Sequence, residues 1–283
     1  MDINGKTRIY GIFGYPIGHT LSPKLHNAVF KKRGLNAAYL PFEVKPDYIS
    51  EAVEALKSLS IAGVNVTLPH KEAAANLADE VPNDVDRAIG AVNTLVLKNG
   101  QVLGYNTDGP GFLADLKEGM GFLPKDRRIL MVGAGGAARS VAFYLLRDDC
   151  GELIIYNRTP ERAKGLADYL CTFFPKARVR SILSIEDLGT EKIDLVVNAS
   201  SCGMKLDDPF PVNPDVFKLA SYAYDLIYSP AETKFLVEAK KRKIRCSNGL
   251  GMLVRQAAYA HCLWFPDAAK ETVTPLYREA YRS

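Results

Sequence analysis

A glycine-rich turn follows a short apolar run near the middle of this 283-residue chain. The apolar run is residues 129–132 (Ile-Leu-Met-Val), which predicts a strand buried on both faces of a parallel sheet. Gly133 and Gly135 follow at the spacing in which a tight turn opens a helix, and the small Ala138 lets that helix pack close to the strand. Because a helix N-terminus offers free N–H groups to an anion, the segment predicts a pyrophosphate-binding turn.

A second apolar segment, residues 153–156, predicts the next strand of the same fold. An NAD-binding fold usually places an acidic residue after this strand, on the ribose 2′-hydroxyl. This chain has Asn157, Arg158 and Thr159 there, and Arg162 lies one helical turn beyond Arg158. A guanidinium forms paired, charge-assisted hydrogen bonds with a phosphate, so the segment predicts NADP as the cofactor. The alternative is an ordinary turn that carries a solvated arginine.

The composition is that of a globular protein without a concentrated charged surface. Hydrophobic residues make up 47% and charged residues 24%, and the formal net charge of +4 arises from intermixed basic and acidic residues. A nucleic-acid-binding protein would gather its basic residues in a stripe, so no nucleic-acid partner is expected. No stretch approaches the length of a membrane span, and the first residues lack an apolar signal core, so we expect no membrane association and a cytoplasmic location.

Cysteine and histidine usage argues against a disulfide framework and against a metal site. The five cysteines are scattered and odd in number, which favours reduced thiols. His19 and His26 lie close together in the sequence, but no further ligand cluster accompanies them. We therefore expect no metal, and we expect His19, His26 and His70 to form only local hydrogen bonds.

Segments typical of strands and helices alternate along the chain, which predicts an α/β fold. Asn99-Gly100, between residues 93–98 and 101–105, is a strong β-hairpin signal. We expect an N-terminal α/β substrate domain (1–108) and a Rossmann-type NADP-binding domain (109–245), which begins with a helix at 109–120. An apolar helix over 252–265 lies beyond the dinucleotide unit, so residues 246–283 are expected to return to the first domain and complete it. Two domains with a cleft between them would unite a cofactor with a small substrate.

Several short motifs resemble, in sequence order, those of the shikimate dehydrogenase family. They are residues 18–27, 65–71, 90–94 and 104–108, the glycine turn with residues 157–159, residues 225–230, and residues 249–253 with Gln256. Their number and order make the resemblance specific. It implies a reversible, NADPH-dependent reduction of 3-dehydroshikimate to shikimate, a step of aromatic amino acid and chorismate biosynthesis. We expect a monomer or homodimer that acts on this small-molecule substrate.

The resemblance implies that Lys71 is the catalytic lysine and that Asp108 is its partner. Reduction of a ketone needs a hydride donor, a proton donor for the developing alkoxide and a cage that fixes the ring. An ammonium group can stabilise or protonate that oxygen, and a neighbouring carboxylate favours the charged form of a lysine. We therefore expect Lys71 to act as a charged donor in the reduction direction, while the individual proton-transfer roles stay open. Without the family, Lys71 would be read as a solvated residue that opens a helix.

The resemblance also implies a set of polar side chains around the substrate. Thr20 and Ser22 match a pair of hydroxyls that hold the substrate carboxylate, and Tyr228 could add a phenol. The residues matching contacts to the carboxylate or ring hydroxyls are Asn65, Thr67, Asn93 and Gln256. Taken singly, each has a structural alternative: Ser22 before Pro23 could be a helix N-cap, and Gln256 could be one polar residue on a packed helix.

The expected cofactor contacts combine the two nucleotide motifs with later loops. They are Gly133, Ala134, Gly135, Gly136, Ala137, Asn157, Arg158, Thr159, Arg162, Ser200, Gly249 and Met252. Ser200 follows the strand predicted at 193–198, at the sheet edge suited to the nicotinamide. We expect Ser201, Gly203 and Leu253 to lie near that ring as well.

Two positions depart from the commonest family pattern. Thr20 replaces a serine, and Ser200 replaces a threonine; both keep a hydroxyl. The extra methyl of Thr20 leaves open a quinate/shikimate dehydrogenase with broader substrate or cofactor use. A second alternative is an NADP-binding regulator without catalysis. The presence of both Lys71 and Asp108 argues against that alternative.

Overall fold

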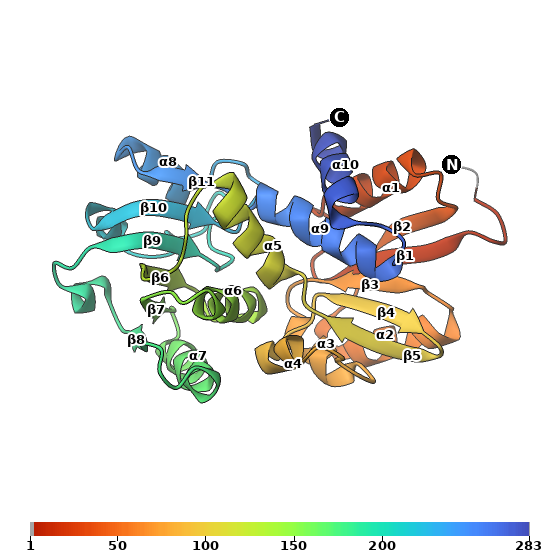
Figure 1. The fold of residues 1–283 in the computed structure, drawn as a ribbon, viewed down its shortest axis with the longest axis horizontal. Helices are drawn as coiled ribbons and strands as arrows, with labels where there is room; N and C mark the ends of the chain where they lie inside the picture. The colour runs from red at the N-terminus through yellow and green to blue at the C-terminus, as the bar shows by residue number, and fades with distance from the viewer. Residues whose placement is uncertain (1–2, 283) are drawn as a thin grey trace. The chain divides into compact units, whose positions relative to one another are not determined.

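The computed structural model describes residues 3–282, and the chain divides into two compact units. Unit 1 runs to Asp108 and is completed by the segment from Val254 onward, whereas unit 2 is Gly109–Leu253. The chain leaves unit 1 at the start of helix α5 (Asp108–Ala114) and returns to it within helix α9 (Leu250–Trp264). Both units are of the predicted α/β class (Figure 1). The assignment of one domain to substrate and the other to cofactor stays a prediction.

The sheet of unit 1 has five strands in the order β2-β1-β3-β4-β5. Its strands are β1 (Arg8–Gly14), β2 (Ala37–Glu43), β3 (Gly63–Val66), β4 (Thr94–Lys98) and β5 (Gln101–Tyr105). The first three pair in parallel, and β4 and β5 pair antiparallel. Asn99 and Gly100 both have positive φ, 52° and 78°, as the tight turn of the predicted hairpin requires.

Helices cover both faces of this sheet. The helices of unit 1 are α1 (Ser22–Lys32), α2 (Ile49–Ser58), α3 (Lys71–Leu77), α4 (Asp84–Ile89), α9 and α10 (Lys270–Arg282), with a short 3-10 turn at Pro46–Tyr48. Successive side chains of β1 point to opposite faces of the sheet and belong to two different hydrophobic cores. Phe13 packs with residues of α2, whereas Tyr10 and Ile12 pack with Phe30 of α1 and Trp264 of α9. The C-terminal part of α9 is thus a core element of unit 1.

Unit 2 is built on a six-stranded parallel sheet in the order β11-β10-β9-β6-β7-β8 (Figure 1). The strands are β6 (Arg128–Val132), β7 (Glu152–Tyr156), β8 (Val179–Ile182), β9 (Ile193–Asn198), β10 (Ala220–Asp225) and β11 (Arg245–Ser247). Residues 129–132 and 153–155 are buried throughout, because both faces of a parallel sheet are covered. The two strands predicted around the glycine turn are confirmed.

The helices of unit 2 follow the expected alternation with a few differences. They are α5, α6 (Gly136–Arg147), α7 (Pro160–Phe173) and α8 (Lys234–Lys241), with 3-10 turns at Ile185–Leu188 and Pro214–Lys218. The helix expected over 109–120 is α-helical only to Ala114 and continues as a π-helical turn, Asp115–Gly119. Asp115 accepts a hydrogen bond from the Tyr224 hydroxyl at 2.7 Å, which ties this turn to β10. Strand β8 and helices α4 and α10 were not predicted.

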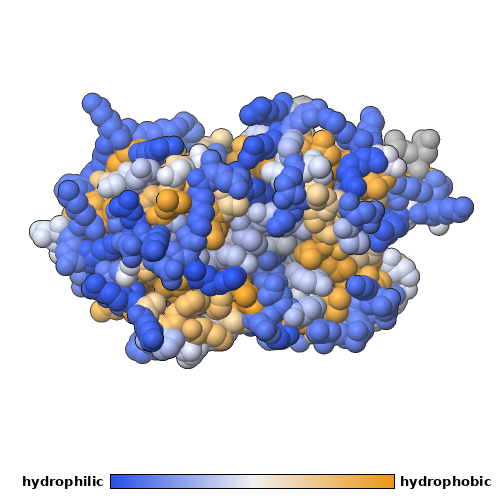
Figure 2. Space-filling model, viewed as in Figure 1, coloured by the Kyte–Doolittle hydropathy of each residue, from blue (hydrophilic) through white to orange (hydrophobic). Residues whose placement is uncertain are grey.

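Hydrophilic side chains cover most of the face drawn in Figure 2, and apolar side chains lie in separate groups between them. Across residues 3–282, none of the helices combines the length and apolar character needed to cross a bilayer.

Candidate active site

An ion pair between Lys71 and Asp108 lies at the carboxyl-terminal side of β3. Lys71 is the first residue of α3, and Asp108 is the first residue of α5. The Lys71 Nζ atom lies 2.6 Å from Asp108 Oδ2, and the side chains are only 16% and 7% exposed. The backbone of Lys71 is also held, because its carbonyl accepts a hydrogen bond from Val92 N at 2.8 Å. The structure therefore brings together the two residues expected to be catalytic.

Asn93 fixes the other oxygen of this carboxylate. Its Nδ2 donates to Asp108 Oδ1 at 2.9 Å and lies 3.3 Å from Gln256 Oε1. Its Oδ1 accepts from the backbone N–H of Thr107 at 2.7 Å. Both oxygens of Asp108 are thus engaged, one by an ammonium and one by an amide, which fixes the orientation of the group.

The Thr107 hydroxyl belongs to the same network but was not among the predicted site residues. It lies 2.9 Å from Asn93 Nδ2 and 3.4 Å from Gln256 Oε1. Thr107 immediately precedes Asp108 in one of the matching motifs, so Thr107 could have been predicted as a site residue from the sequence. Gln256 reaches this network from α9, so the return of the chain supplies part of the unit 1 site.

Asn65 and Thr67 stand at the end of β3, next to this network. Asn65 Nδ2 donates to the Asn93 carbonyl at 3.2 Å and to Thr94 Oγ1 at 3.1 Å. The backbone N–H of Thr67 donates to the Phe13 carbonyl at 2.9 Å, and its side chain is half-buried. A sheet edge where strands β1 and β3 end together therefore holds several of the predicted substrate contacts.

Thr20 precedes helix α1, and Ser22 is the first residue of that helix. The Ser22 backbone N–H donates to Thr20 Oγ1 at 3.3 Å, so the two residues are in contact. Leu21, not Ser22, occupies the N-cap position, so the N-cap alternative for Ser22 is wrong. Within residues 3–282, no hydrogen bond links either hydroxyl to Lys71 or Asp108. Tyr228 lies in unit 2 beyond β10 and is half-buried.

The glycine turn of unit 2 has the geometry of an anion cradle. Gly133 has φ +117°, and a Cβ there would lie 2.9 Å from the backbone of Ala199. Gly135 is the N-cap of the 12-residue helix α6, with φ −92°, and a Cβ there would meet no protein atom within 4 Å. Gly133 is thus required by the fold, whereas Gly135 leaves open space in front of a helix N-terminus. That space fits a pyrophosphate group.

The loop after β7 presents two exposed cationic side chains. They are Arg158 and Arg162, and neither forms an ion pair within residues 3–282. Asn157 Nδ2 donates to the Thr159 carbonyl at 2.9 Å, and Arg162 N donates to the same carbonyl at 3.1 Å, which orders the loop. A guanidinium without a carboxylate partner is available to a phosphate, so this loop fits a 2′-phosphorylated coenzyme.

A buried aspartate organises the loop after β9. Asn198 Oδ1 accepts from the backbone N–H and the hydroxyl of Ser200, at 3.1 and 2.7 Å. Asn198 Nδ2 in turn donates to Asp225 Oδ1 at 3.0 Å, and the Thr233 hydroxyl donates to Asp225 Oδ2 at 2.5 Å. Burial raises the pKa of Asp225 to about 6 against the opposing effect of these hydrogen bonds. Asn198 and Asp225 carried no predicted role, although a polar residue at a buried strand end was a usable signal.

Two other predicted cofactor residues have structural reasons for their identity. A Cβ on Gly249 would lie 1.9 Å from the Leu226 carbonyl oxygen, so close packing against the end of β10 requires glycine. Met252 is buried on α9. Any contact of these two residues with a cofactor stays a prediction.

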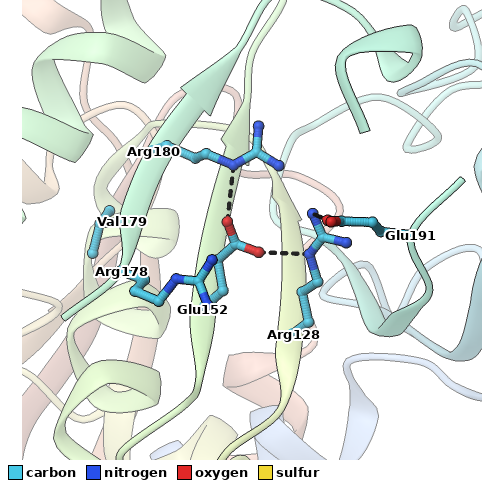
Figure 3. A pocket seen from close by; sticks show the side chains of 6 residues that line it. All are labelled: Arg128, Glu152, Arg178, Val179, Arg180 and Glu191. Carbon is cyan, nitrogen blue, oxygen red and sulfur yellow. Dashed lines mark hydrogen bonds and ion pairs between the residues drawn. The ribbon is translucent and has the colours of Figure 1, made fainter. Parts of the chain in front are cut away.

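A separate charged cluster occupies the opposite, amino-terminal ends of the unit 2 strands (Figure 3). Glu152 accepts from Arg128 Nε at 2.5 Å and from Arg180 Nε at 2.9 Å, beside a cavity of about 310 Å³. Burial opposes ionisation of Glu152, but the hydrogen bonds from Arg180 and Arg128 outweigh it and lower its pKa. The cluster joins the starts of three strands. The glycine turn follows the end of β6, so the cluster lies at the other end of the strands from that turn.

Two of the histidines expected to form only local hydrogen bonds, His26 and His70, have partners far away in the sequence. His70 Nε2 lies 2.7 Å from the Val44 carbonyl, and the buried His26 Nδ1 lies 2.6 Å from the Tyr277 hydroxyl. Within residues 3–282, no group of three or more His, Cys, Asp or Glu side chains could hold a metal ion.

Both the sequence and the fold of this chain are similar to those of known proteins. Residues 12–95 match the family described as the shikimate dehydrogenase substrate binding domain, and residues 118–203 match the family described as shikimate / quinate 5-dehydrogenase. The shikimate dehydrogenase (NADP(+)) of Caldanaerobacter subterraneus subsp. tengcongensis is 42% identical over 93% of this chain and 94% of its own length.

Two solved structures are similar over nearly their whole length. The shikimate dehydrogenase of Aquifex aeolicus has a TM-score of 0.87, with 36% identity and full coverage of both chains. The shikimate 5-dehydrogenase of Thermus thermophilus, solved with NADP(H) and shikimate, has a TM-score of 0.83 with 34% identity, and covers 97% of this chain and 100% of its own.

Proposed function

The chain belongs to the shikimate dehydrogenase family, and we propose that it catalyses the reversible, NADPH-dependent reduction of 3-dehydroshikimate to shikimate. The proposal rests on one observation: Lys71 pairs with Asp108 inside a hydrogen-bond network of side chains predicted to contact the substrate. A regulator that had lost catalysis would not need a buried lysine–carboxylate pair of this kind.

Lys71 supplies the proton-donating group of the reaction. When bound, NADPH supplies the hydride that reduces the ketone carbon. As that carbon becomes tetrahedral, negative charge develops on its oxygen, and the ammonium of Lys71 donates a hydrogen bond and then a proton to it. Asp108 accepts from Lys71 through one oxygen and from Asn93 through the other, so it orients the Lys71 ammonium for this transfer. Lys71 regains its proton from water, and the oxidation of shikimate follows the same path in reverse.

The polar residues around this pair are suited to a polyhydroxylated ring. Asn65, Asn93 and Gln256 present amide groups, and Thr67 adds a hydroxyl at the same sheet edge. We assign Thr20 and Ser22 to the substrate carboxylate, with Tyr228 as a further phenolic donor. Converging neutral donors can hold a carboxylate without a cationic partner.

Unit 2 supplies the coenzyme site. The glycine turn at Gly133–Gly135 would hold the pyrophosphate through backbone N–H groups at the start of α6. Arg158 and Arg162 would hold the 2′-phosphate, with Asn157 and Thr159 ordering their loop. Ala134, Gly136 and Ala137 continue the turn, and Ser200 lies on the loop assigned to the nicotinamide. The chain would act as a monomer or a homodimer.

A direct assay tests this proposal and its alternative. We expect absorbance at the reduced-nicotinamide band to rise when the protein is mixed with shikimate and NADP. With quinate, whose ring carries an added hydroxyl at the carboxylate-bearing carbon, we expect a lower kcat/KM, because Thr20 adds a methyl at this end of the site. Equal kcat/KM for the two acids would identify a quinate/shikimate dehydrogenase, and no turnover of either acid would refute the proposal.

A further inference from the structure

Tyr39, on the edge strand of unit 1, is joined to a predicted substrate residue by a buried hydrogen bond. The Tyr39 hydroxyl lies 2.7 Å from Asn65 Oδ1, and the two side chains are 0% and 4% exposed. Tyr39 belongs to β2 and Asn65 to β3, so the hydroxyl reaches past the intervening strand β1.

The direction of this hydrogen bond follows from the surroundings of Asn65. Its amide nitrogen faces the Asn93 carbonyl at 3.2 Å, and a backbone carbonyl can only accept. The NH₂ group of Asn65 must therefore face Asn93, and its oxygen must face Tyr39, which makes the Tyr39 hydroxyl the donor. Because the two N–H bonds are directed to Asn93 and Thr94, the remaining lone pair of Oδ1 is left to accept from a ligand hydroxyl.

Helix α1 holds Tyr39 in place by two independent contacts. The Asn27 side chain accepts from Tyr39 N and donates to the Tyr39 carbonyl, both at 2.8 Å. The adjacent His26 stacks on the Tyr39 ring, with centroids 4.3 Å apart and planes inclined by 5°. A main-chain clamp and a ring stack together leave the hydroxyl little freedom.

We infer that Tyr39 is a positioning residue for substrate binding, acting through Asn65. Its hydroxyl fixes the amide of Asn65 so that Oδ1 accepts a hydrogen bond from a ring hydroxyl of the substrate. This inference rests on the proposed function, because Asn65 is a substrate contact only in that assignment. The Tyr39 hydroxyl acts on the Asn65 amide and not on the proton-donating group, so we expect it to affect binding more than turnover.

Tyr39→Phe removes the hydroxyl and keeps the ring that stacks on His26. We expect the dissociation constant and the KM for shikimate to rise roughly 3–10-fold, as for the loss of one hydrogen bond, with kcat changed less than about twofold. The KM for NADP should not change. Tyr10→Phe is the matched control, because Tyr10 is equally buried on the neighbouring strand and its hydroxyl has no hydrogen-bond partner within residues 3–282. We expect that control to bind shikimate as the wild type does.

A double-mutant cycle separates positioning from a general effect on folding. In an Asn65→Ala background, Tyr39→Phe should weaken shikimate binding no further, because the tyrosine acts through the amide that is already gone. Calorimetric titration of each full-length variant with shikimate gives the four dissociation constants. Three results would each overturn the inference even if the wild type oxidises shikimate. They are unchanged shikimate binding in Tyr39→Phe, an equal loss of binding in Tyr10→Phe, and additive losses in the cycle. Failure of the wild type both to bind and to oxidise shikimate would refute the proposed function and this inference together.

Discussion

Lys71 and Asp108 form a 2.6 Å ion pair although they lie 37 positions apart in the sequence. One residue begins α3 and the other begins α5, so the sheet edge of unit 1 determines their meeting. The pair is mostly buried, and its second carboxylate oxygen is bound by Asn93. A carboxylate held in this way orients an ammonium group toward a substrate oxygen.

Asp108→Asn should lower kcat by about 100–1,000-fold, because it removes the charge that keeps the Lys71 ammonium oriented. The isosteric amide keeps the size of the side chain, so NADP binding should persist. Asp79→Asn is a matched control, since Asp79 pairs with Lys57 at 2.9 Å in the same unit but outside the proposed site. Steady-state kinetics of both variants checks the prediction, and an equal loss in the two would refute it.

Arg158→Ala should weaken NADP binding by roughly 10–100-fold, from the loss of charge-assisted hydrogen bonds to the 2′-phosphate. NAD binding should hardly change, because NAD lacks that phosphate. Lys164→Ala, which removes an exposed cation of α7 that pairs with Asp168, serves as the control. Titration with both coenzymes measures the effect, and a similar loss for NAD and NADP would show that Arg158 does not contact the phosphate.

Asp225→Asn should change how the stability of unit 2 depends on pH. Burial raises the pKa of Asp225 from 3.8 to about 6, so the folded protein holds this proton more tightly than the unfolded chain. The resulting stabilisation is complete below pH 3.8 and is lost as the pH rises through about 6. It amounts to about 3 kcal/mol at most. The asparagine variant lacks this contribution.

Urea unfolding from pH 4 to pH 8 therefore tests Asp225 directly. The free energy of unfolding of the wild type, minus that of Asp225→Asn, should fall between pH 4 and about pH 6 and stay constant above it. A difference that rises with pH over this interval would contradict the sign of the shift.

Tyr277→Phe should destabilise the protein by about 1–3 kcal/mol, because it leaves two buried imidazoles without their shared hydroxyl. The Tyr277 hydroxyl lies 2.6 Å from His26 Nδ1 and 3.1 Å from His261 Nδ1, and all three residues are fully buried. Tyr10→Phe removes a buried hydroxyl that has no partner within residues 3–282, so it should leave stability nearly unchanged or slightly higher. The free energy of unfolding of both variants, measured in urea, shows whether the Tyr277 hydroxyl stabilises the fold. Equal values for the two variants would mean that only the packing of the Tyr277 ring matters.

Local patterns were sufficient to predict the main strands and the two motif-bearing turns. Residues 129–132 and 153–156 are short apolar runs in a parallel sheet, and Asn99-Gly100 has the positive φ angles of a tight hairpin. Strand β8 escaped prediction because only Ile182 among its four residues is fully buried, so its pattern is weak. Helix α10 is largely polar and contains Pro275, which obscures its helical pattern.

Contacts between distant segments that involve residues with no predicted role could not be predicted from the sequence. The Tyr39–Asn65 hydrogen bond crosses a strand, and the His26–Tyr277 contact joins residues 251 positions apart. Motif resemblance named Lys71, Asp108, Asn93 and Gln256, but their hydrogen-bonding directions depend on the geometry of the folded sheet edge. The networks that support a site are therefore visible only in the structure.

Steady-state kinetics of Lys71→Ala with shikimate and NADP, set beside calorimetric binding of NADP, tests whether Lys71 is the proton-donating group. We predict that kcat falls by about 100–10,000-fold while the dissociation constant for NADP is unchanged, since only the proton-donating group has been removed. Turnover at the wild-type rate in this variant would show that Lys71 is not the proton-donating group.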